Sequence, residues 1–305
     1  MTSVRVFVPG SIGNVGPGFD VLGLAVDGIG DRFTIELTEA ASSIAGITGR
    51  DHELVPKDPN ANCTTIAAVA LLRSQGDKRN VRVSIDRSLP LAGGLGASAA
   101  ASVGGAYGAA IALGRSVPQV AILTAALAGE ASVSSAHLDN IAPSLLGGLT
   151  IARCVEPADA VRVPIQGTWW LTIVSPAMRL TTKKARSVLP QLVTQADFVH
   201  QLAHTSSLIT AFVSGDHELA RRALVDVYAE PHRAKLIGSF FAVKSAAVKS
   251  GALGCSISGA GPSVFALCAT EAIAHSCAAA MKAAFWPVEA QTHTGRIAAE
   301  GARVL

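Results

Sequence analysis

The sequence predicts an α+β fold in two domains, and three observations support this prediction. A chain of 305 residues is long enough for one large or two ordinary domains, at roughly 100 to 200 residues each. Apolar strands alternate irregularly with helical stretches in both halves, an order that is typical of α+β proteins. A segment with prolines and acidic residues at 153–167 separates the halves. We therefore expect domains at residues 1–165 and 166–305.

Strands and turns dominate the predicted first domain. Short runs with apolar residues at alternate positions indicate strands, and the stretches between them favour helices that pack on the sheet. The predicted strands are VRVFVPG, DRFTIEL and VRVSID, and the predicted helices cover residues 62–73, 98–113 and 118–130.

The second domain is expected to begin with an apolar strand, TWWLTIVSP, followed by helices. These helical stretches cover residues 183–189, 191–212, 217–228 and 235–250. The sequence GCSISGAGPSVFALC then predicts a strand, a glycine turn and a second strand. A last helix and two short strands complete the prediction.

Composition argues against several classes of function. Half of the residues are hydrophobic and 15% are charged, which is typical of an ordered globular protein. The net charge of +3 is scattered, so we do not expect nucleic acid as a partner. The five cysteines contain no C-x-x-C pair, which favours reduced thiols and a cytoplasmic location. The weakly charged stretch at 88–129 is broken by prolines and rich in small residues, so no membrane span is expected.

The uncharged stretch PLAGGLGASAAASVGG at residues 90–105 raises three interpretations. No lysine follows its glycines, so it lacks the Walker A pattern. It satisfies the loose G-x-G-x-x-A dinucleotide pattern, but no acidic residue lies about 20 positions further on to hold a ribose. A helix of small residues that packs closely on a sheet is the third interpretation.

Physical chemistry favours an anion site in this stretch. The glycines lead into a helix predicted to begin near Ser98, and the first N–H groups of a helix lack intrahelical partners. Glycines also let phosphate oxygens approach the backbone closely. The hydroxyl of Ser98 and the carboxylate of Glu130, the first acid after the loop, are oxygen ligands suited to Mg²⁺. A surface glutamate at a helix end is the alternative for Glu130.

Three segments in order resemble the GHMP kinases, a family named for galactokinase, homoserine kinase, mevalonate kinase and phosphomevalonate kinase. They are VPGSIGNVGPGFDVLGLAVD, PLAGGLGASAA and GALGCSISGAGPSVFAL, which resemble the family's first motif, phosphate loop and third motif. The resemblance implies a ribosomal-protein-S5-like N-terminal domain, a ferredoxin-like C-terminal domain, and use of ATP with Mg²⁺. The family usually has two serines after GLG, and Ala97 replaces the first, so we expect weaker phosphate binding at most.

Four segments resemble the members of this family that phosphorylate L-homoserine. They are NVGPGFDVLGLA, AHLDNIAPSLLGG, TTKKARSVLP and EPHRAKLI. This resemblance implies ATP-dependent phosphorylation of L-homoserine to O-phospho-L-homoserine, on the path to threonine.

The resemblance also implies catalysis without a strong general base. Asn140 occupies the position of a basic aspartate in mevalonate-type relatives, and an amide cannot take a proton. Positioning and charge neutralisation then supply most of the catalysis. Asn14 and Asp20 resemble residues that hold the acceptor, and Asp20 is the one carboxylate that could assist proton removal; ordinary turn chemistry is the alternative for both. The predicted catalytic residues are Asn14, Asp20, Ser98 and Glu130, the last two as metal ligands.

An amino-acid substrate needs a cationic group for its carboxylate and an anionic partner for its ammonium. Arg186 and Arg233 align with the family's substrate arginines and can bind a carboxylate bidentately, with solvated helix charges as the alternative. Asp139 is expected to pair with the ammonium, and His137 and Thr182 to line the same pocket; a packed, hydrogen-bonded histidine is the alternative for His137. The predicted substrate-binding residues are Asn14, Asp20, His137, Asp139, Asn140, Thr182, Arg186 and Arg233.

The nucleotide is expected on the glycine loop, closed by the SGAGP turn at 258–262. Asn62 resembles the family's adenine-pocket segment, although Asn is also a common N-cap. The predicted nucleotide-binding residues are Asn62, Pro90, Gly93, Gly94, Leu95, Gly96, Ala97, Ser98, Ala99, Gly259 and Gly261.

Three alternatives remain at this point. They are another GHMP kinase acting on a different small alcohol, a catalytically silent ligand sensor on the same fold, and a dehydrogenase, which the missing ribose acid disfavours. A homodimer is compatible with the sequence.

Overall fold

A long antiparallel pair of strands organises the first sheet. β1 (Ser3–Gly13) and β2 (Leu22–Thr38) pair from Ser3 opposite Glu36 to Gly13 opposite Gly23, with a shift in register between Pro9 and Ser11. The sheet has the order β11-β1-β2-β4-β3, and the hairpin of β5 and β6 is attached through β2. The remaining strands are β3 (Ser43–Gly49), β4 (Asn80–Arg87), β5 (Leu149–Val155), β6 (Ala158–Val163) and β11 (Arg303–Val304). The computed structural model describes residues 3–134 and 136–305.

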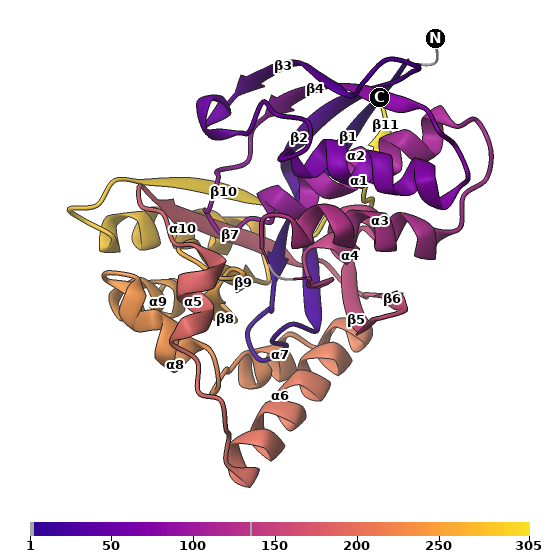
Figure 1. Cartoon of the computed structure of the whole chain (residues 1–305). Coiled ribbons are helices and arrows are strands. Elements are labelled where there is room, and N and C mark those ends of the chain that lie inside the picture. The colour runs from indigo at the N-terminus through magenta and orange to yellow at the C-terminus, as the bar shows by residue number, and fades with distance from the viewer. Residues whose placement is uncertain (1–2, 135) are drawn as a thin grey trace.

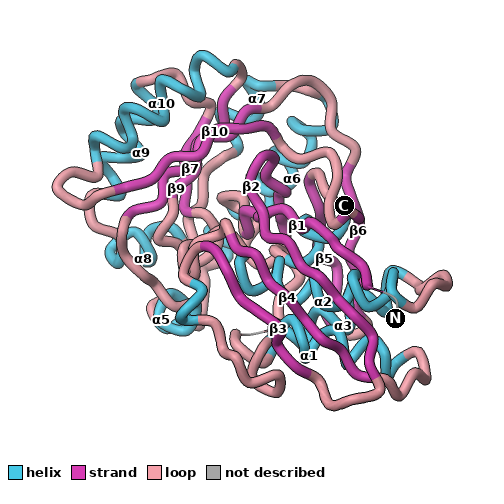
Figure 2. The backbone as a smooth tube through the Cα atoms, turned by 90° about the horizontal axis from the view of Figure 1, so that it is seen from above, coloured by secondary structure: helices cyan, strands magenta, loops and turns pink. Residues whose placement is uncertain are grey.

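Helices rich in small residues cover one face of this sheet (Figure 2). They are α1 (Cys63–Ser74), α2 (Ala97–Ala112), α3 (Gln119–Ala131) and the short α4 (Ile141–Leu146). The glycines of α2 permit close contact, because a Cβ at Gly105 would lie 1.9 Å from the Thr64 carbonyl oxygen, and one at Gly104 would lie 2.2 Å from the Phe33 ring. The small residues after the glycine loop therefore serve close packing as well.

The second sheet is a smaller antiparallel one with the order β10-β7-β9-β8. Its strands are β7 (Trp170–Pro176), β8 (Gly254–Ile257), β9 (Val264–Cys268) and β10 (Ala290–Arg296). The helices α9 (Phe240–Lys249) and α10 (Glu271–Ala284) pack on it and enclose a second apolar core. Figure 1 shows the two sheets side by side, with both termini of the chain at the far end of the first sheet.

Further helices connect β7 with β8. They are α5 (Thr182–Ser187), α6 (Gln195–Ser214), α7 (His217–Ala223) and α8 (Glu230–Arg233), with the 3₁₀ turn η2 (Ala234–Leu236) after α8. Another 3₁₀ turn, η1 (His52–Leu54), follows β3 in the first sheet's half of the chain. α6 spans 20 residues but buries only Leu208, Ala211 and Phe212. Across residues 3–134 and 136–305, none of the helices combines the length and the apolar character that a membrane crossing requires.

The predicted α+β class is confirmed, and two details differ from the sequence analysis. Residues 153–167 were expected only to separate the halves, yet most of them belong to the β5–β6 hairpin of the first sheet. Arg153 and Asp159 pair with each other across this hairpin. Such charged residues interrupt the alternation of apolar and polar positions by which strands are predicted. β11 also returns to the first sheet beside β1. We keep the division at residues 165 and 166 as a proposal, with this terminal strand as an exception.

Candidate active site

A cavity lies where loops from both sheets meet. Its wall combines the turn after β1, the loop between β4 and α2, the segment before α4, and the turn between β8 and β9. The predicted residues that line it are Asn14, Asp20, Pro90, Gly93, Gly94, Gly96, Ala97, Ser98, Ala99, Glu130, His137, Asp139, Asn140, Thr182, Arg186, Arg233, Gly259 and Gly261. Segments far apart in the sequence therefore converge on one site.

Two predicted residues lie outside this wall. Leu95 is 2% exposed and belongs to the core. Asn62 caps α1: its side-chain oxygen accepts from the Thr64 N–H at 3.0 Å, and its amide donates to the Pro56 carbonyl at 2.9 Å. It borders an adjoining pocket that shares Ser98 with the main cavity. Its observed contacts are thus those of an N-cap.

The glycine loop is held from the second sheet's side. The Ser258 hydroxyl donates to the Gly94 carbonyl at 2.6 Å, and the Ser263 N–H donates to the Gly93 carbonyl at 3.3 Å. Gly94 has a φ of 83°, and a Cβ there would lie 2.6 Å from the Ser258 carbonyl oxygen, so only glycine fits. The SGAGP turn therefore packs directly on the loop.

The first turn of α2 faces this loop without a side-chain cap. Gly96 is its N-cap, with a φ of 63°, and it offers no side-chain acceptor to the first N–H groups of a 16-residue helix. Free N–H groups and the helix dipole attract an anion. The start of α2 can therefore bind phosphate oxygens.

Ser98 and Glu130 form a polar pair in the cavity wall. The Ser98 hydroxyl donates to Glu130 Oε1 at 2.9 Å, and no described residue bonds the buried Oε2. Burial raises the pKa of Glu130 to about 7, with a smaller contribution from the charge of Asp139 and an opposing one from Ser98. An unmatched buried carboxylate oxygen beside a hydroxyl fits a cation that prefers oxygen ligands.

The protein supplies only part of a metal shell. Across residues 3–134 and 136–305 there is no group of three or more His, Cys, Asp or Glu side chains that could hold a metal ion. Mg²⁺ typically binds through one or two carboxylates together with substrate phosphates and water. Ser98 and Glu130 therefore suit a cation that arrives with a nucleotide.

Asp20 forms an ion pair with Arg186 in the cavity wall. One nitrogen of the Arg186 guanidinium, Nη2, donates to both Asp20 oxygens, at 2.9 and 3.0 Å. His137 Nδ1 lies 4.0 Å from Asp20 Oδ2. Burial lowers the pKa of His137, which the Asp20 charge opposes and the two nearby arginines reinforce. Arg186 Nε is buried without a partner among the described residues, so the guanidinium keeps a donor for a ligand.

Arg233 lies deeper and is only 3% exposed. It donates to the carbonyl oxygens of Ala185 at 3.2 Å and Gly259 at 3.0 Å. Burial lowers the pKa of Arg233, and the charge of Arg186 lowers it further. Two guanidinium groups at one end of a cavity form a strong site for a carboxylate.

Phe19 is a site residue that the sequence analysis missed. The guanidinium carbons of Arg186 and Arg233 lie 5.3 and 5.1 Å from its ring centroid. The Tyr228 ring packs edge-on against it at 4.9 Å. Phe19 thus holds both arginines through cation–π contact. Its place directly before Asp20 in a glycine-rich turn was the available signal.

Asn14 joins three parts of the site. Its amide nitrogen donates to the Gly259 carbonyl at 2.7 Å, its amide oxygen accepts from the Asp20 N–H at 3.0 Å, and its own N–H donates to Asp139 Oδ2 at 3.2 Å. Burial raises the pKa of Asp139 to about 7, and the charge of Asp20 raises it further. The Asn140 amide oxygen accepts from Ser11 at 3.0 Å. Asn14 therefore serves to position the turn that carries Asp20.

A glycine loop before an uncapped helix, joined to a pocket with two arginines, is the arrangement expected of a kinase of small molecules, and comparison with known proteins agrees. The sequence profile described as GHMP kinases N terminal domain matches residues 62–148, and that described as GHMP kinases C terminal matches residues 208–287. Together these ranges cover more than half of the chain. The chain belongs to the GHMP kinase family.

Within this family, the chain is similar to homoserine kinases from several organisms. The homoserine kinase of Chlorobium phaeobacteroides (strain DSM 266) is 37% identical over 321 residues and covers 100% of both chains. That of Arabidopsis thaliana is 39% identical and covers 94% of this chain and 79% of its own. The crystal structure of homoserine kinase from Cytophaga hutchinsonii superposes with a TM-score of 0.95 at 36% identity, covering 100% of this chain and 98% of that one.

More distant members share the fold alone. The Leishmania major mevalonate kinase, solved with R-mevalonate, superposes with a TM-score of 0.71 at 14% identity and covers 94% of this chain and 95% of its own. The predicted two-domain GHMP kinase fold is therefore confirmed.

Proposed function

We propose that this chain transfers the γ-phosphoryl group of ATP to the hydroxyl of L-homoserine and forms O-phospho-L-homoserine for threonine biosynthesis. One observation supports this substrate above others of the family: Arg186 and Arg233 lie together on Phe19 at one end of the cavity. Paired guanidiniums suit a substrate with a free carboxylate. The similarity to homoserine kinases over the full chain supports the same choice.

The nucleotide would bind with its phosphates on the glycine loop. The uncapped N-terminus of α2 supplies N–H groups, and the 258–262 turn closes the loop from the second sheet. Ser98 and Glu130 would hold Mg²⁺, which neutralises phosphate charge when it is bound. A bound cation would keep Glu130 ionised, although burial alone raises its pKa to about 7.

The amino-acid end of the substrate would bind across the cavity. Arg186 Nε has no partner among the described residues, and Arg186 and Arg233 together would hold the carboxylate. Asp139 is buried, with a pKa raised to about 7, and an ammonium beside it would favour its charged form. These contacts would orient the hydroxyl toward the γ-phosphorus.

In the transfer step, the substrate hydroxyl oxygen forms a bond to the γ-phosphorus and the bond to the β–γ bridging oxygen breaks, which releases ADP. Asp20 already accepts two hydrogen bonds from Arg186, and the Asn140 amide cannot take a proton. We therefore assign orientation of the hydroxyl to Asp20. The proton leaves late, onto the transferred phosphoryl group, as a loose transition state allows.

The free cysteines of the described chain agree with a reducing compartment, and we propose that the enzyme acts in the cytoplasm. We propose a homodimer as the assembly, and the molecular mass from sedimentation equilibrium would test it.

An ADP-release assay across a panel of small alcohols tests the proposed function. L-Homoserine should give the highest kcat/KM, ahead of R-mevalonate and galactose. A higher kcat/KM for either of these two would assign a different activity of the family. ATP binding without ADP release from any alcohol would favour a silent ligand sensor.

A further inference from the structure

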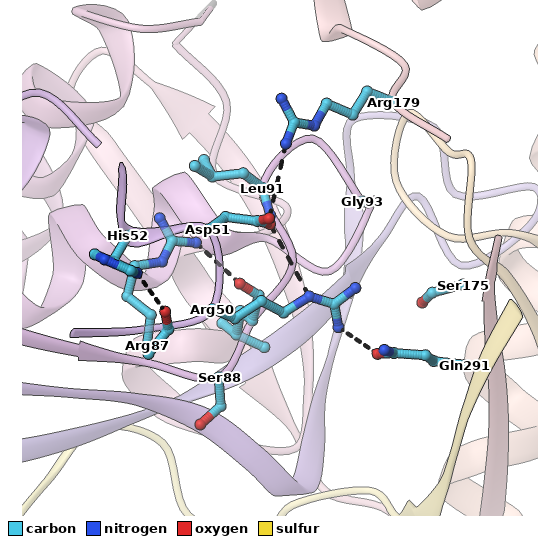
Figure 3. A network of polar contacts seen from close by, with 12 residues as sticks. Arg50, Asp51, His52, Arg87, Ser88, Leu91, Gly93, Ser175, Arg179 and Gln291 are labelled. Carbon is cyan, nitrogen blue, oxygen red and sulfur yellow. Dashed lines mark hydrogen bonds and ion pairs between the residues drawn. The ribbon is translucent and has the colours of Figure 1, made fainter. Parts of the chain in front are cut away.

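A partly buried hydrogen bond holds the start of the glycine loop. Asp51 follows β3 and adopts a left-handed backbone, with φ 52° and ψ 24°. Its Oδ2 accepts the Leu91 N–H at 2.9 Å, and the Asp51 side chain is 23% exposed. Leu91 directly follows Pro90 at the start of the loop, and Figure 3 shows it beside Asp51.

Asp51 also connects this loop to the second sheet's side of the molecule. Arg179, which follows β7, lies 3.7 Å from Asp51 Oδ1. Arg50 Nε lies 4.0 Å from Asp51 Oδ2, and its Nη1 donates to Gln291 of β10 at 2.7 Å (Figure 3). Asp51 is therefore the centre of a polar network that joins the loop to the segment after β7 directly and to β10 through Arg50.

The loop conformation next to Leu91 needs such support. Ala92 has a φ of 51°, a conformation that costs free energy for a residue with a Cβ. The neighbouring backbone is fixed on both sides, because Leu91 is bound by Asp51 and the Ala92 carbonyl accepts the Leu180 N–H at 3.4 Å. Without Asp51, one of these two restraints would be lost.

Leu91 lies where the main cavity and the adjoining pocket meet. It lines the main cavity with the glycine loop, and it also lines the adjoining pocket that Asn62 borders. The orientation of the peptide before Leu91 therefore affects both pockets. We propose that Asp51 is a positioning residue for ATP: by holding the Leu91 N–H it pre-forms the glycine loop and lowers the ordering cost of nucleotide binding.

This inference rests on the proposed function for its nucleotide, but it is testable without the alcohol substrate. Asp51→Gly removes the carboxylate and keeps the left-handed backbone available. Asp51→Asn keeps an acceptor for the Leu91 N–H and removes the charge that faces Arg50 and Arg179. Comparing the two variants separates the hydrogen bond from the ion pairs, which are expected to be weak at the surface.

The affinity for ADP with magnesium chloride, measured by isothermal titration calorimetry, is the first measurement. Asp51→Gly should weaken ADP binding and raise the KM for ATP about 10-fold, since the hydrogen bond has a charged acceptor. The KM for L-homoserine should change less than about 2-fold, because the arginine pocket is unaltered. Asp51→Asn should stay within about 3-fold of the wild type for ADP.

Asp77 provides the matched control. It also accepts a backbone N–H, from Arg79 at 2.8 Å, and pairs with the same arginine at 2.7 Å, but it does not line the cavity. Asp77→Gly and Asp77→Asn should leave ADP affinity unchanged, whatever they do to the melting temperature.

Two results would overturn the inference. The first is wild-type ADP affinity in Asp51→Gly, even with a lower melting temperature, which would reduce Asp51 to a structural residue. The second is an equal loss in Asp51→Asn and Asp51→Gly, which would remove the hydrogen bond as the cause. Failure of the wild type to phosphorylate L-homoserine would instead disprove the proposed function, while the ADP comparison would still decide the role of Asp51.

Discussion

The two ends of the cavity are built in different ways. The proposed phosphate end consists largely of backbone, from the glycine loop and the uncapped start of α2, beside the side chains of Ser98 and Glu130. The carboxylate end consists of side chains, with Arg186 and Arg233 on Phe19. Backbone N–H groups suit the phosphate chain that every nucleoside triphosphate shares. Charged side chains recognise what distinguishes one alcohol from another, so we expect substrate specificity at that end.

The largest effect is expected at the phosphate end. Glu130→Gln removes the charge that would stabilise the metal, and kcat should fall about 100-fold or more at saturating magnesium. Steady-state kinetics with ATP and L-homoserine would measure this. Glu218→Gln, at an exposed carboxylate on α7, is the control. If Glu130→Gln retained more than about a tenth of the wild-type kcat, Glu130 would not be a metal ligand.

The second-largest effect is expected at the arginine end of the cavity, in the KM for L-homoserine instead of kcat. Arg233→Lys cannot form the same forked hydrogen bonds, so the KM for L-homoserine should rise about 30-fold. The KM for ATP should stay nearly constant, because the proposed nucleotide site is the glycine loop. Arg221→Lys, which changes an exposed arginine paired with Glu218, is the control. Equal increases in both KM values would contradict the division of the cavity into two ends.

The smallest effect concerns Phe19. Phe19→Leu keeps an apolar side chain but removes the ring that both guanidiniums contact, so the KM for L-homoserine should rise about 3-fold. Phe241→Leu, at a phenylalanine that is 66% exposed on α9, is the matched control. An unchanged KM would show that the arginines hold their positions without this ring.

The same difference explains how far the sequence could predict the site. The glycine loop was predictable because close backbone contact requires glycine at fixed positions, as at Gly94. The role of Phe19 was missed, because it depends on two arginines that only the tertiary structure brings to its ring. Asp51 was missed for a similar reason, since its partner Leu91 is 40 positions away.

Local sequence patterns also predicted some helices and strands of the fold better than others. The helices α1, α2 and α3 were expected within one or two residues of their observed ends, because long apolar stretches specify them. β3 was missed, since its seven residues include two glycines and most of them are exposed. Its strand conformation depends on pairing with β4, which the local sequence does not encode.

The most direct test of the central claim removes the carboxylate from the substrate instead of the arginines from the protein. The measurement is the ratio of kcat/KM for L-homoserine to that for 3-aminopropan-1-ol, with ATP saturating. The account predicts a ratio of at least about 30, because the guanidiniums of Arg186 and Arg233 would lose their charged partner. A ratio below about 3 would mean that Arg186 and Arg233 do not select the substrate, and the assignment of this end of the cavity would be wrong.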